Sequence, residues 1–160
     1  MFREIQGLPA HALLVHAAVA LVPMLILAAV AYALVPRFRS KVGWLAGLLS
    51  VAAVAAVYVA KESGEQLEAV LVAKNYPPEI LGQVTEHAAL ADLLFWWTLG
   101  LAAATLLLLL ITSGYRRVRA LPTWLSWLLA AVVVVLAGVT GWYVYQTGDT
   151  GARAVWEGVL

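Results

Sequence analysis

Four apolar stretches, each long enough to cross a lipid bilayer, constrain this chain more than any other feature. They cover residues 11–35, 42–60, 88–112 and 123–146. A transmembrane helix needs about 20 apolar residues, each adding about 1.5 Å to its length. With 64% hydrophobic and 12% charged residues, a chain of 160 residues has far more apolar surface than a water-soluble core of this size can bury. We therefore expect an integral membrane protein.

The connectors between the apolar stretches predict how the spans are arranged. Residues 36–41 and 113–122 are short, so the helices on either side of each connector are expected to be antiparallel neighbours. We predict an all-α fold, a four-helix up-and-down bundle that forms one domain over residues 1–160. In such a bundle the first and third spans lie diagonally across from each other.

Basic residues in two connectors predict the orientation of the chain. The connectors after spans one and three contain no acid and carry Arg37, Arg39, Lys41, Arg116, Arg117 and Arg119. Because positively charged loops stay in the cytoplasm, both termini and the connector over 61–86 are expected on the outer side. The aromatic residues agree with this orientation. The expected inner belt is Trp44, Tyr115, Trp124 and Trp127, and the outer belt is Tyr58, Trp142, Tyr143 and Tyr145.

The long outer connector holds most of the acidic residues. Ser63 and Gln66 have the spacing of a capping box, and apolar residues recur at helical spacing after them. This pattern predicts a short amphipathic helix on the outer membrane surface. Residues 75–78 end that helix, and Glu79 begins another that continues into span three.

All three histidines lie at the outer ends of spans one and three. His11 and His16 are five residues apart, so they point about 140° apart on one helix, and His16 lies deeper. An unpaired imidazole in hydrocarbon is costly, so His16 must be hydrogen-bonded or must bind something. Two imidazoles on facing helices suit the axial positions of a haem iron. We predict that His16 and His87 bind haem b for electron transfer, with His11 and Asp92 as hydrogen-bond or proton partners.

Two other functions stay open at this point. A bare transition-metal ion is one, with ligands drawn from His11, His16, His87, Glu65 and Asp149. A structural or assembly subunit without a cofactor is the other. No nucleophile arrangement is present, so we expect an electron-transfer or binding protein rather than a stand-alone enzyme.

The remaining composition limits the partners of the chain. The absence of cysteine excludes thiolate metal sites and disulfides, and a net charge of +1 gives no basis for nucleic-acid binding. Gly43 and Gly47 form a small-xxx-small pair, which permits a close helix crossing inside the bundle or in a homodimer. The sequence leaves open a homodimer that shares one haem.

Several short blocks resemble the bacterial membrane family catalogued as domain of unknown function 2231. They are Gly7-Leu8-Pro9-Ala10-His11, Ser63-Gly64-Glu65, Glu86-His87 and Gly148-Asp149-Thr150-Gly151. The chain departs from the family pattern at Ala12, where members often have proline, and Asp149 stands where members often carry histidine or aspartate.

The resemblance implies a protein of the bacterial cytoplasmic membrane, and it marks His11, Glu65, His87 and the Asp149 loop as family positions. Some members look fused to Rieske-type iron–sulfur domains. By analogy, this implies a membrane haem relay with a redox partner on the outer side.

Overall fold

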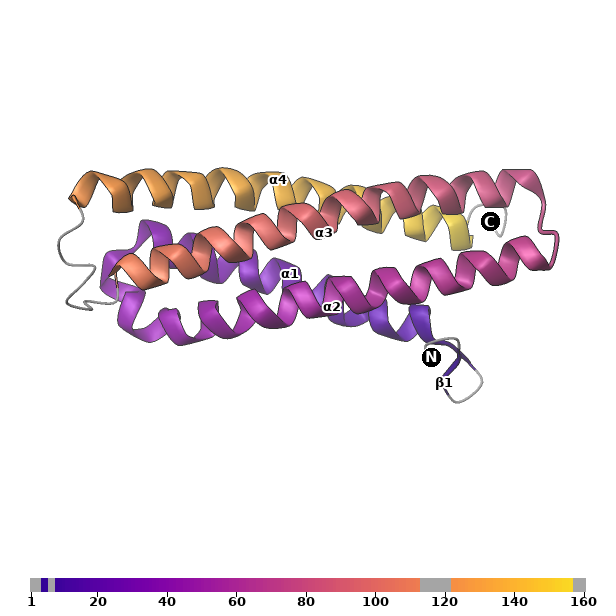
Figure 1. Cartoon of the computed structure of the whole chain (residues 1–160), viewed down its shortest axis with the longest axis horizontal. Helices are drawn as coiled ribbons and strands as arrows, with labels where there is room; N and C mark the ends of the chain where they lie inside the picture. Colours follow the sequence, from indigo (N-terminus) through magenta and orange to yellow (C-terminus); the bar gives the residue numbers. More distant parts are fainter. Residues whose placement is uncertain (1–3, 6–7, 113–121, 157–160) are drawn as a thin grey trace.

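Four long helices make up most of the chain in a computed structural model that describes residues 4–5, 8–112 and 122–156 (Figure 1). The helices are α1 (Ala10–Leu34), α2 (Arg39–Ala73), α3 (Pro78–Thr112) and α4 (Thr123–Trp156). A short 3-10 helix, η1 (Pro36–Phe38), joins α1 to α2, and strands β1 (Glu4–Ile5) and β2 (Leu8–Pro9) pair ahead of α1. The predicted all-α bundle is confirmed.

The helices run up and down in a ring, as the short connectors predict. Consecutive helices pack along their lengths, α4 also packs on α1, and α1 makes few contacts with α3, which lies diagonally across the bundle. The start of α1, the turn between α2 and α3, and the end of α4 lie at one end of the bundle (Figure 1). We call this the outer end, after the orientation that the basic residues predict, and the end that holds η1 the inner end.

All four helices are long and apolar enough to cross a membrane. Aromatic side chains face outward near both ends, with Trp124 63% exposed and Tyr145 62% exposed on α4. These two residues are 21 positions apart, which is about 31 Å along a helix and close to the thickness of a bilayer core. Arg116, Arg117, Arg119 and Tyr115 of the second basic connector lie outside the described residues.

The prediction of a separate short helix on the membrane surface is wrong. Helix α2 continues without a break through residues 61–73 and ends at Ala73, before the turn that contains Asn75 at φ 53°. Ser63 does not cap a helix, because it lies inside α2 with its hydroxyl bonded to the Ala60 carbonyl. At 35 residues each, α2 and α3 are about 52 Å long, so they extend about 20 Å beyond a bilayer core. The helix expected to begin at Glu79 and to run into span three is confirmed, with its first residue at Pro78.

Two glycines of α2 let side chains of the neighbouring helices α1 and α3 lie against its backbone. A side-chain carbon at Gly43 would lie 3.1 Å from the Tyr32 ring, and one at Gly47 would meet Leu109 at 3.7 Å. The small-xxx-small pair therefore serves packing inside the bundle. The buried face of α1 includes Val22, Leu25 and Ala29. The rotation of α1 about its axis that buries these residues also decides where its histidines point.

Candidate imidazole-pair site

Two histidines from diagonal helices meet at the outer end of the bundle. The rings of His11 on α1 and His87 on α3 have centroids 6.2 Å apart and planes inclined at 79°. Both residues are half-buried. His11 and His87 thus bring two imidazoles together across the diagonal of the bundle, and we call them the imidazole pair.

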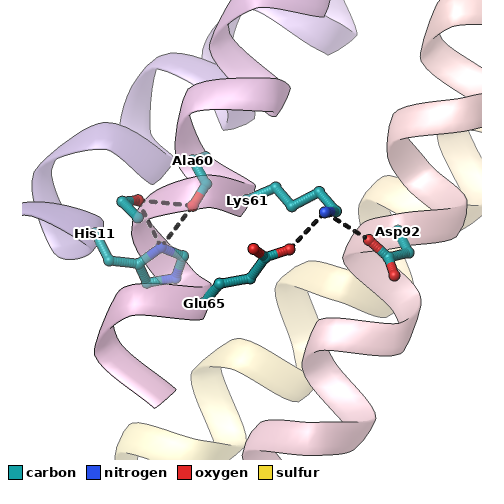
Figure 2. Close-up of polar contacts among 6 residues, drawn as sticks. His11, Ala60, Lys61, Glu65 and Asp92 are labelled. Atoms are coloured by element: carbon teal, nitrogen blue, oxygen red, sulfur yellow. Dashed lines mark hydrogen bonds and ion pairs between the residues drawn. The ribbon is translucent and has the colours of Figure 1, made fainter. Parts of the chain in front are cut away.

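The ring of His11 is held by the helix that follows it in the chain. Its Nδ1 lies 3.0 Å from the Ala60 carbonyl oxygen and 3.1 Å from Ser63 Oγ. Figure 2 shows the His11 ring turned toward Ala60 of α2. The ring also lies against Gly64, where a side-chain carbon would come within 3.1 Å of Cε1. We call these three residues of α2 the first seat.

The ring of His87 is held in the same manner by α4. Its Nδ1 lies 3.2 Å from Thr150 Oγ1, and the ring also hydrogen-bonds the backbone of Thr147. A side-chain carbon at Gly151 would lie 2.9 Å from Cε1 of this ring. These three residues of α4 form the second seat.

The hydrogen bonds of the seats fix which ring nitrogen carries the proton. A carbonyl oxygen only accepts, so Nδ1 of His11 donates to Ala60. Thr150 Oγ1 donates its proton to carbonyls of α4 at 3.0 and 3.2 Å, so its oxygen accepts from Nδ1 of His87. In both rings Nε2 is therefore the atom with the free lone pair. Within the part of the chain that the structure describes, neither Nε2 has a hydrogen-bond partner.

Comparison with known proteins supports the resemblance found in the sequence. A family model described as "Predicted membrane protein (DUF2231)" matches residues 7–160. The chain belongs to the DUF2231 family. No curated protein and no solved structure matches it. In this DUF2231 protein, the sequence blocks that carried the resemblance include the imidazole pair and the serine, threonine and glycines of both seats.

The acidic residues predicted to join the site are engaged elsewhere. Lys61 binds Glu65 at 2.5 Å and Asp92 at 3.3 Å, so this lysine links α2 to α3 beside the first seat (Figure 2). Asp149 pairs with Arg153 at 2.8 Å on the surface of α4. Asp92 is thus the partner of an ammonium group, not of an imidazole. Among the described residues no group of three metal-ligating side chains converges.

The structure does not bring His16 to His87. The His16 side chain is exposed on α1, and its Nδ1 bonds back to the Ala12 carbonyl at 2.7 Å. Because His11 faces His87, the angle of about 140° between His11 and His16 turns His16 away from the bundle axis. The prediction paired His87 with the deeper histidine, His16. In the structure, the histidine beside His87 is His11.

A repeated pattern that sequence reasoning missed identifies both seats. Residues 60–64 and 147–151 share the form Ala or Thr, two residues, Ser or Thr, then Gly. The chain shows no obvious repeat in its apolar stretches, so these five-residue matches were hidden. A comparison of α2 with α4 at the level of polar and glycine positions finds them.

Proposed function

We propose that this membrane protein binds haem b between Nε2 of His11 and Nε2 of His87, and that it transfers single electrons at the outer end of the bundle. The observation that carries the proposal is a pair of half-buried imidazoles on diagonal helices, each bonded through Nδ1 and with no partner for Nε2 among the described residues. An imidazole nitrogen with a free lone pair is a good ligand for a Lewis acid such as iron, and the two rings offer one such atom each.

The number of ligands favours haem over a bare ion. A haem iron takes four nitrogens from the porphyrin and needs only two axial ligands from the protein. A zinc ion or a similar bare ion takes three or four ligands from the protein. The described residues bring together two histidines and no third ligand, and a site that used Glu65 and Asp149 would have to break two ion pairs.

The distance between the rings also supports axial ligation. Metal–nitrogen bonds of about 2.0–2.1 Å, added to the ring radii, place two opposed imidazoles with centroids about 6 Å apart. The observed separation is 6.2 Å. A tetrahedral ion would require the rings to move closer. The neighbouring buried residues, Ala10, Ala60 and Ser63, are small, which favours a flat group at this end.

Histidines on a bound haem would serve a carrier rather than a catalyst of substrate chemistry. A haem held by His11 and His87 would supply one-electron chemistry, and two protein ligands would leave no position for a substrate. The hydrogen bonds from Nδ1 to the seats raise the basicity of each imidazole and hold its orientation. In the proposed orientation the site faces the outer side of a bacterial cytoplasmic membrane. Its partner there would be a one-electron carrier such as a Rieske-type iron–sulfur protein.

The test is an absorption spectrum of the protein purified from membranes in detergent and supplied with haemin. We expect Soret and alpha bands in the reduced-minus-oxidised spectrum of the wild type. His11→Ala and His87→Ala should each lose them, whereas the matched control His16→Ala should keep them. The absence of both bands from the wild type after haemin supplementation would overturn the proposal.

Metal analysis of the same preparations separates the other two functions. A bare-ion site predicts stoichiometric metal in the wild type and in His16→Ala, and its loss in His87→Ala. A subunit without a cofactor predicts neither bands nor metal, and histidine variants that change only the stability of the bundle.

A further inference from the structure

The two seats of the imidazole pair are built from the same three kinds of group. In each case a histidine in the outer part of one helix is held by the next helix in the chain. His11 of α1 is held by α2, and His87 of α3 is held by α4. Each seat supplies a hydroxyl to Nδ1, a backbone group three residues earlier, and a glycine directly after the hydroxyl.

The distances in the two seats are nearly equal. Nδ1 lies 3.1 Å from the hydroxyl oxygen in the first seat and 3.2 Å in the second. A carbon added at the glycine would lie 3.1, 3.3 and 3.8 Å from Cε1, Nδ1 and Nε2 of His11. The corresponding distances to His87 are 2.9, 3.3 and 3.7 Å. In both seats the hydroxyl bonds back to the carbonyl three residues earlier, at 2.6 and 3.2 Å, and the Thr150 hydroxyl also lies 3.0 Å from the Gln146 carbonyl.

We propose that Ser63-Gly64 and Thr150-Gly151 are equivalent positioning elements, one in each half of the chain, which present the two imidazoles to a single ligand in the same way. On this view α1–α2 and α3–α4 are matching halves. The inference rests on the proposed function for the identity of the ligand. It adds that the ligand offers two equivalent and opposite coordination positions, as a haem iron does.

The chemistry of each seat explains how it positions its ring. The carbonyl and hydroxyl oxygens accept from Nδ1, so they turn Nε2 away from the seat helix. The glycine lets the ring lie directly on the helix surface, since a side-chain carbon there would overlap the ring or press on it. The ring has little freedom to yield, because moving it away from the helix breaks the bonds at Nδ1.

These glycines differ from the other glycines near the outer end. A carbon added at Gly82 or Gly148 meets nothing within 4 Å. Close packing of two helix backbones is the common role of glycine in membrane bundles. At Gly64 and Gly151, however, the nearest atoms belong to imidazole rings. The contact therefore points to a positioning role at the site.

Haemin titration of the detergent-purified full chain tests the proposal. Outer-shell partners of metal ligands typically change affinity about 10- to 100-fold. We expect Gly64→Ala and Gly151→Ala each to weaken haemin binding by about that factor, and by similar amounts. Gly148→Ala is the matched control on α4 and should bind as the wild type does. Unequal effects, with one seat variant like the control, would overturn the equivalence of the two seats.

Variants of the two hydroxyl residues provide a second test in case the glycine variants do not fold. Ser63→Ala and Thr150→Ala should each weaken haemin binding about tenfold. The exchanged variants Ser63→Thr and Thr150→Ser should restore it, because each places the hydroxyl of one seat in the other. Failure of the exchanged variants to bind better than the alanine variants would contradict the proposal.

A measurement on the protein without haem keeps this inference separate from the proposed function. In the nitrogen NMR spectrum of the imidazoles, we expect His11 and His87 with protonated Nδ1 and unprotonated Nε2. Gly64→Ala should alter only the His11 signals and Gly151→Ala only those of His87, with His16 unchanged in both. If the wild type binds no haemin but shows this pattern, the proposed function is wrong and the positioning role of the two seats is supported. If neither glycine variant changes the NMR signals of His11 or His87, the proposed positioning role is wrong, whatever the protein binds.

Discussion

The two ends of the bundle both bury polar side chains, but only one end satisfies them. At the inner end the Tyr32 hydroxyl bonds Thr112 at 2.6 Å, and Thr112 bonds the Leu108 carbonyl at 2.6 Å. Arg39 donates to the Tyr32 carbonyl at 3.1 Å and lies over the Tyr32 ring at 5.5 Å. At the outer end, neither imidazole Nε2 has a hydrogen-bond partner among the described residues. Polar side chains in a membrane bundle thus stabilise the fold where their hydrogen bonds are satisfied within the protein. Where a donor or acceptor lacks a partner, they point to a ligand.

The largest expected difference between the two ends is their response to haemin. Free haemin at about 1,000 times its Kd should raise the free energy of unfolding by about 4 kcal/mol, because it binds only the folded chain. The double variant His11→Ala with His87→Ala should show none of this increase. Thermal unfolding in detergent, with and without haemin, measures it. An equal increase in the double variant would contradict the assignment of the ligands.

Changing one ligand should alter the electron affinity of the outer end without emptying it. A thioether is a weaker donor to ferric iron than an imidazole, so His87→Met should retain haem and raise its midpoint potential. The expected rise is on the order of 100 mV. Potentiometric titration of the absorption bands measures the change, and His16→Met serves as the control. A potential equal to that of the wild type would show that His87 does not bind the iron.

Removing a closed set of bonds at the inner end should affect only stability. Arg39 bonds the carbonyls of Tyr32 and Ala33 at the end of α1, where a cation is favoured. Arg39→Ala should therefore lower the free energy of unfolding by about 1–2 kcal/mol. Lys41→Ala removes the same charge from the same connector and should cost less. Haemin affinity should be unchanged in both variants, and a loss of affinity in Arg39→Ala would break the separation between the two ends.

The smallest effect is expected at the ion pairs beside the first seat. Glu65 and Asp92 are more than half exposed, with side-chain exposures of 53% and 56%. Surface pairs of this kind contribute about 0–1 kcal/mol, and salt screens them. Lys61→Met should lower stability within this range, less at high salt, with no change in haemin affinity. A large loss of haemin affinity in Lys61→Met would show that Glu65 and Asp92 take part in the site.

Hydropathy and connector length predicted the spans, their up-and-down order and the diagonal placement of the histidine helices. These features depend on the bilayer and on short loops, which leave few alternatives. The surface helix was wrong because Ser63 matched a capping signal locally. Its hydroxyl instead serves Ala60 and His11. A contact across 52 residues has no local signature.

The choice between the two histidines of α1 depended on the rotation of that helix. His11 precedes the buried Val22 by 11 residues, about three turns, so both lie on one face. His16 precedes Val22 by six residues and faces about 120° away. Because α1 is apolar all round, no polar stripe reveals which face is buried. Depth in the apolar run was therefore a poor guide to which histidine lies beside His87.

The same reasoning separates His87 from Asp92 on α3. His87 precedes the buried Thr98 by 11 residues and shares its face, whereas Asp92 precedes it by six. Asp92 thus lies on another side of the helix, where Lys61 reaches it. A carboxylate within a predicted span is a reasonable functional candidate. Here its position on the helix, rather than its depth, decides its partner.

The division of the imidazole pair between α1 and α3 has a consequence for biogenesis. As the chain is made, the hairpin of α1 and α2 enters the membrane first and carries one seated histidine. The second histidine arrives only after the turn at residues 74–77 has reversed the chain. If the imidazole pair binds haem as proposed, a half-inserted chain would offer one of its two histidine ligands and could not form a six-coordinate haem. In this protein a six-coordinate spectrum would therefore report that both halves had been inserted and assembled.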